Sequence, residues 1–88
     1  IPYGTRVTAE LLTQLERAES VLRELGYRQF RVRHHGTVAR IELLAEDFER
    51  AVSRDRAAIS QGVRAAGYLY VSLDLTGYRT GAMNEVLP

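Results

Sequence analysis

The fold is decided by residues 30–42, which read FRVRHHGTVARIE. Apolar and polar side chains alternate on both sides of the glycine, a pattern typical of two strands joined by a tight turn. A turn at residues 35–36 would place Arg31 directly opposite Arg40. Because successive strand residues point to opposite faces, Arg31, Arg33 and Arg40 are expected to share one face of the hairpin.

All twelve basic residues of the chain are arginines, and three of them lie on this hairpin. Like charges placed directly across a strand pair destabilise it, so a cationic face indicates that an anion binds there. The alternative is that arginine replaces lysine throughout the chain and merely covers a solvated sheet face. The anion hypothesis requires that Arg31 and Arg33 are not occupied by acidic neighbours of the same chain.

Length and composition predict one small globular domain. The chain has 88 residues, 45% of them hydrophobic and 26% charged, and a net charge of +1. No apolar run approaches the roughly 20 residues that a membrane-spanning helix needs. The small net charge gives no overall field to hold nucleic acid. Cysteine is absent, which excludes disulfides, thiolate nucleophiles and cysteine metal sites from these residues.

Two helices and the hairpin are expected to form the core. Leucines and Ala18 recur at helical spacing from a Thr8 cap to a stop at Gly26. A second helical pattern covers residues 46–66 and ends at Gly67, with Ser53 as the cap of a second piece if the helix breaks. The inner face of the hairpin, with Phe30 opposite Ile41 in the register given above, should be built from Phe30, Val32, Ala39, Ile41 and Leu43.

Residues 68–75 alternate strictly and predict a last strand. Its four aliphatic residues should face inward, while Tyr68, Tyr70, Ser72 and Asp74 face outward. We expect this strand to be central or well covered and to pair beside the first strand of the hairpin.

The order helix, strand, strand, helix, strand predicts an α+β two-layer sandwich. Two helices would pack on one face of a three-stranded, mostly antiparallel sheet, leaving the other face open for a partner. Residues 1–7 are expected to be a linker, and residues 76–88 an ordered tail. Since the chain begins at Ile1 without a methionine, we expect a single domain, residues 1–88, of a longer protein.

Other chemistry is not evident in the residues. His34 and His35 should point to opposite sides of the strand, so they cannot both face one metal ion. The carboxylates are scattered, and those at residues 46–47 suit the start of a helix. Neither a Gly-x-Ser-x-Gly motif nor a glycine-rich phosphate loop is present, so no catalytic residue is predicted in this chain.

Three sequence blocks together resemble the C-terminal domain of the LarE family. They are PYGT at residues 2–5, FRVRHHG at 30–36 with ARIE at 39–42, and LDLTGYRTGAMNE at 73–85. LarE proteins are ATP-dependent sacrificial sulfur transferases of the PP-loop pyrophosphatase superfamily. The blocks follow in the family's order and spacing over nearly the whole chain, although serines would be expected where Thr80 and Ala82 stand.

The resemblance implies that an N-terminal PP-loop domain adenylates a carboxylate of a pyridinium dicarboxylate mononucleotide. A cysteine upstream of Ile1 would then give up its sulfur, yielding a precursor of the nickel-pincer nucleotide; some members are thought to use an iron–sulfur cluster instead. ATP and magnesium would bind mainly outside this chain. The implied protein is a cytoplasmic homo-oligomer, with neither nucleic acid nor a membrane as a partner.

The resemblance also assigns residues. Arg31 and Arg33 match the family's contacts to the substrate phosphate, the role that the hairpin pattern suggests independently. Arg40, on the same face, and Arg79, from the same or a neighbouring subunit, are expected to add substrate contacts. Glu19, by its position in the first helix, resembles a carboxylate that holds a metal, although a solvated helix glutamate is the simpler interpretation.

Two other functions stay open. One is a purely structural oligomerisation domain, resembling the dimerisation module of GMP synthetases. The other is a freestanding anion-binding or RNA-binding module, which the net charge disfavours.

Overall fold

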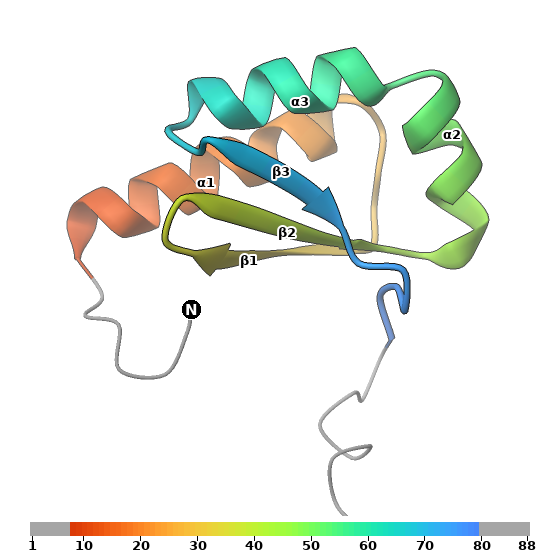
Figure 1. Cartoon of the computed structure of the whole chain (residues 1–88), viewed down its shortest axis with the longest axis horizontal. Helices are drawn as coiled ribbons and strands as arrows, with labels where there is room; N and C mark the ends of the chain where they lie inside the picture. The colour runs from red at the N-terminus through yellow and green to blue at the C-terminus, as the bar shows by residue number, and fades with distance from the viewer. Residues whose placement is uncertain (1–7, 80–88) are drawn as a thin grey trace, which may run out of the picture.

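Within residues 8–79, three helices and a short 3₁₀ helix pack on a three-stranded sheet (Figure 1). The computed structural model describes residues 8–79, so the predicted linker at 1–7 and most of the predicted tail, 80–88, lie outside the described part. The elements are α1 (Ala9–Glu24), β1 (Phe30–His35), β2 (Val38–Leu43), η1 (Ala45–Asp47), α2 (Phe48–Ser53), α3 (Arg56–Ala65) and β3 (Tyr70–Leu73). The predicted α+β class is confirmed, with six antiparallel and four parallel register pairs in the sheet.

Helix α1 begins and ends where the sequence predicts. The Thr8 hydroxyl accepts a hydrogen bond from the Leu11 amide at 3.1 Å, which satisfies one of the free N–H groups of the first turn. Gly26 has a φ of 99°, which ends the helix. A residue with a Cβ would be strained in this conformation, whereas glycine is not. Ala18 and Leu22 face the sheet and are fully buried.

The register of the hairpin differs from the prediction by two residues. The turn is formed by Gly36 and Thr37, because Gly36 takes a positive φ of 59° at the first turn position. Arg31 is therefore opposite Glu42, and the like-charge pair is Arg33 opposite Arg40. A shift of two residues preserves which side chains share a face, so the predicted inner face is confirmed, with Phe30 opposite Leu43 rather than Ile41.

Strand β3 lies beside β2 and parallel to it, so the predicted pairing with β1 is wrong. The strand is also shorter than predicted and lies at an edge of the sheet. The amides of Leu69 and Tyr70 both donate to the Thr37 carbonyl, which fixes the start of β3 beside the hairpin turn. Leu69 is exposed and Tyr68 is buried at 2% exposure, the reverse of the predicted orientation, because both precede the regular strand.

The second helical region is broken, as the sequence allowed. Helix α2 ends at Ser53 and α3 begins after Asp55, so Ser53 is not the cap that was predicted. Asp55 takes the N-cap position, but its carboxylate makes no capping hydrogen bond. The carboxylate is instead directed inward to Tyr27.

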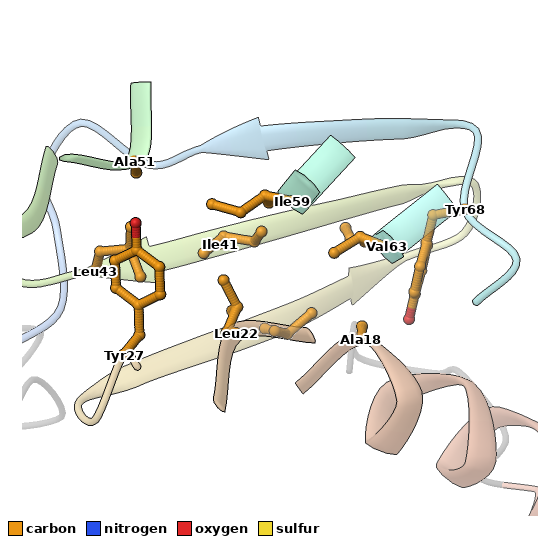
Figure 2. Close-up of a cluster of buried hydrophobic side chains, with 11 residues drawn as sticks. Ala18, Leu22, Tyr27, Ile41, Leu43, Ala51, Ile59, Val63 and Tyr68 are labelled. Atoms are coloured by element: carbon orange, nitrogen blue, oxygen red, sulfur yellow. The ribbon is translucent and has the colours of Figure 1, made fainter. Parts of the chain in front are cut away.

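The core lies between the helices and the inner sheet face (Figure 2). Leu22 of α1, Ile41 of β2 and Val63 of α3 meet in its centre, while Tyr27 and Tyr68 lie at its two ends. The opposite face of the sheet, which we call the outer face, carries no helix in the described part of the chain (Figure 1). None of the described helices is long and apolar enough to cross a bilayer.

Candidate anion-binding site

The outer face gathers the three arginines that the sequence placed together. Arg31 and Arg33 alternate along β1, and Arg40 lies on β2 directly across from Arg33. All three are half-buried, so each guanidinium is held near the sheet while part of it reaches solvent. The predicted common face is therefore present, although the pair of like charges directly opposite one another is Arg33 and Arg40.

A carboxylate of the same chain bridges that pair. Glu42 Oε2 lies 3.3 Å from Arg33 Nε and 3.4 Å from Arg40 Nη2. Arg40 has a second acidic partner, because its Nε lies 3.4 Å from Asp74 Oδ2. Arg40 is therefore paired with two carboxylates of its own chain. Arg33 meets the requirement for an anion site only in part, because its Nε is paired with Glu42.

Arg31 has a different environment. Its Cζ lies 5.0 Å from the centre of the Tyr78 ring, and no carboxylate between residues 8 and 79 pairs with it. Its cross-strand neighbour Glu42 is directed to Arg33 and Arg40 instead. Arg31 is therefore the hairpin arginine with the most donor capacity left for an external anion.

The sequence did not predict the partners of these three arginines. Glu42 and Asp74 were expected on the outer face by alternation, but nothing in the sequence indicated which arginine each would bind. Tyr78 follows the last strand in a segment without hydrophobic periodicity, so no sequence pattern indicated its contact with Arg31. Arg79 follows Tyr78 and is exposed; its substrate role stays a prediction.

Glu19 lies in the helical layer and not on the outer face. It pairs with Arg23 one turn along α1, at 3.4 Å, and both side chains are more than one third exposed. With Tyr27 and Phe30 it lines a shallow hollow beside the start of β1. No group of three or more metal-ligating side chains occurs in residues 8–79, so the metal role of Glu19 stays a prediction with no partner ligand in this region.

The two histidines point to opposite sides, as predicted. His34 lies on the inner side, where its Nδ1 is 2.9 Å from the Tyr68 hydroxyl, and burial lowers the pKa of His34. His35 is exposed at the hairpin end. The arrangement favours a packing role for His34 over metal binding.

A second charged cluster, formed by Tyr27, Arg50, Arg54 and Asp55, lies on the helical side and was missed by the sequence patterns. The Tyr27 hydroxyl donates to Asp55 at 2.7 Å, and Arg54 donates to both carboxylate oxygens at 2.9 and 3.1 Å. Hydrogen bonds from Arg54, and then from Tyr27, lower the pKa of Asp55 to about 2. Burial, supported by the bond to Asp55, raises the pKa of Tyr27 to about 12. Arg50 Nε lies 3.5 Å from the same carboxylate, so the cluster joins α2 and the start of α3 to the α1–β1 connection that contains Tyr27.

Comparison with known proteins gives relatives over nearly the whole chain. No family model matches. An uncharacterized protein of Synechocystis sp. is 45% identical over 87 residues, which is 98% of this chain and 32% of that protein. A pyridinium-3,5-bisthiocarboxylic acid mononucleotide synthase of Lactiplantibacillus plantarum is 42% identical over 87 residues, 98% of this chain and 31% of the synthase.

The chain thus spans about a third of the length of the curated relatives it matches. Identity of this level over almost every residue agrees with the sequence blocks and with the cationic hairpin on which one of them lies. On this evidence the chain is a LarE-like domain.

Proposed function

We propose that this domain holds the phosphate of a mononucleotide substrate for an enzyme of nickel-pincer cofactor biosynthesis that transfers sulfur. The name of the Lactiplantibacillus relative supports this, because it describes the formation of a thiocarboxylated pyridinium mononucleotide. Such a molecule carries a phosphate at one end and the reacting carboxylates at the other. A domain that grips the phosphate would fix where the carboxylates lie.

The observation that carries the proposal is the placement of Arg31 and Arg33. Both project from the same face of β1, and Arg31 has no carboxylate partner among the described residues. Guanidinium groups match phosphate oxygens in charge and in the spacing of their N–H donors. A rigid strand that holds two of them in a fixed relation reduces the entropy lost when the anion binds.

In this proposal the chemical reaction takes place on residues outside this chain. Residues 8–79 contain no group of three carboxylate or imidazole ligands, and the sequence has neither cysteine nor a glycine-rich phosphate loop. No step through magnesium or ATP is assigned to these residues. In the proposal the domain binds and orients the substrate, and a PP-loop domain joined to it supplies activation and sulfur.

The test uses the natural full-length protein with Arg31→Ala and Arg33→Ala combined. The matched control is Arg17→Ala with Arg64→Ala, which removes two exposed arginines from α1 and α3. Since a hydrogen bond to a charged group contributes about 1.5–3 kcal/mol, the hairpin variant should bind the substrate mononucleotide at least tenfold more weakly. The control should bind like the wild type, and oligomer size should be the same in all three proteins.

One observation favours a second candidate, an oligomerisation module similar to that of GMP synthetases. Leu69, Tyr70 and Leu75 are 58%, 64% and 82% exposed around the edge strand β3. Apolar side chains beside an unpaired strand edge suit contact with another chain. In this case the hairpin variant would retain nucleotide affinity, and a Leu69→Ser, Tyr70→Ser variant would change the oligomer size, which size-exclusion chromatography with light scattering measures.

A further inference from the structure

The ring of Tyr78 supports Arg31 without using its hydrogen-bond donors. The distance of 5.0 Å from Arg31 Cζ to the ring centre lies within the range of about 6 Å where cation–π attraction is effective. An aromatic face attracts the charge, whereas a carboxylate would also occupy N–H groups. We propose that Tyr78 is a positioning residue that holds Arg31 ready for phosphate, an inference that rests on the proposed function.

The backbone fixes the place of this ring. The Tyr78 amide donates to the Leu43 carbonyl at 2.7 Å, at the end of β2. The preceding turn is closed by Asp74, whose carboxylate accepts from the Thr76 amide at 2.9 Å and whose carbonyl accepts from Gly77 at 3.1 Å. A Cβ on Gly77 would lie 2.9 Å from the Leu43 oxygen, and its φ is 89°. The turn therefore has one close-packed arrangement, and that arrangement brings the ring to Arg31.

Two other arginines of the described region also lie over aromatic rings, but each has an acidic partner. Arg50 lies 4.0 Å from the Tyr27 ring centre and pairs with Asp55. Arg23 lies 5.9 Å from the Phe30 ring centre and pairs with Glu19 on its own helix. In those contacts the charge is neutralised within the fold. For Arg31 the ring is present and no carboxylate of residues 8–79 accompanies it, as expected where the anion comes from outside.

The experiment measures the affinity of the full-length protein for nicotinic acid mononucleotide, a pyridinium carboxylate that carries a 5′-phosphate. Tyr78→Leu removes the ring and should weaken binding about threefold to tenfold, while Tyr78→Phe should stay within about twofold of the wild type. In an Arg31→Ala background Tyr78→Leu should have no further effect, because the ring acts through Arg31. Binding of the riboside, which lacks the phosphate, should not change in any variant.

A series at position 78 keeps the test decisive if Tyr78→Leu fails to fold. Progressive fluorination of phenylalanine at this site preserves its shape and withdraws charge from the ring face, so affinity should fall with each fluorine. Constant affinity across the series, or an equal loss for Tyr78→Leu with and without Arg31, would overturn the positioning role. If Arg31→Ala with Arg33→Ala binds normally, the proposed function itself fails; if that variant is weak while Tyr78→Leu is not, only this inference fails.

Discussion

The buried side chain of Asp55 makes the stability of the folded state depend on pH. Arg54 and Tyr27 hydrogen-bond its carboxylate and hold its pKa at about 2, below the ordinary value of 3.8. A lowered pKa means that the folded state favours the charged form. The resulting stabilisation is complete above about pH 4 and is lost as the pH falls through about 2.

The Asp55→Asn variant should lose this acid dependence. We expect its free energy of unfolding to be lower than that of the wild type at pH 6, and the difference to shrink steadily as the pH falls from 4 to 2. Urea unfolding followed by circular dichroism at several pH values measures the effect. A difference that stays constant across this range would show that the Asp55 charge does not matter.

For single residues, the sequence predicted the sheet face on which a side chain lies but not the side chains that it contacts. Strand alternation correctly placed Arg31, Arg33 and Arg40 together, because the register differs from the predicted one by two residues and an even shift keeps every side chain on its face. It could not show that Glu42 would bridge two of them, since that depends on side-chain rotamers and on the true register. The contact of Tyr78 with Arg31 depends on the path of a turn, for which hydrophobic periodicity carries no information.

Among the elements, helices α1 and α3 pack closely through a glycine. A Cβ on Gly62 of α3 would lie 2.8 Å from both Cγ atoms of Val21 on α1. Valine is stiff at χ1 and cannot move aside without strain. Gly62 therefore acts as a spacing residue between the two helices that cover the sheet.

Gly62→Ala should lower the free energy of unfolding by about 1 kcal/mol, because overpacking costs about 1–3 kcal/mol and the gain in helix propensity returns up to about 1. Adding Val21→Ala removes the clash, so the double variant should be more stable than the sum of the two single effects predicts. Thermal and urea unfolding measure both quantities. A Gly62→Ala protein as stable as the wild type would show that α1 and α3 can move apart freely.

Element boundaries were predictable where a cap or a glycine marks them, as at Thr8, Gly26 and Gly67. The pairing of β3 was not, because two positions beside the hairpin were open and the sequence pattern of an edge strand resembles that of a central one. The turn at Gly36 and Thr37 was misplaced by one residue because the predicted and observed registers bury the same side chains. Local patterns thus gave the elements, and long-range contacts decided their arrangement.

In the whole molecule, positive and negative charges nearly cancel, but the outer face of the sheet carries more positive than negative groups. The net charge is only +1, but the outer face carries three guanidinium groups against the carboxylates of Glu42 and Asp74. The helices and the core occupy the other side of the sheet (Figure 1). Such an arrangement favours recognition of a small anion over binding to an extended polyanion.

The central claim is that Arg31 and Arg33 bind the substrate phosphate, and calorimetric titration with paired ligands tests it most directly. Nicotinic acid mononucleotide and its riboside are titrated into the full-length wild type and into the Arg31→Ala, Arg33→Ala variant. Removal of the ligand's phosphate should weaken binding at least tenfold in the wild type and hardly at all in the variant, because the partners of the phosphate are already gone. An equal loss in both proteins would contradict the claim, since the phosphate would then bind elsewhere.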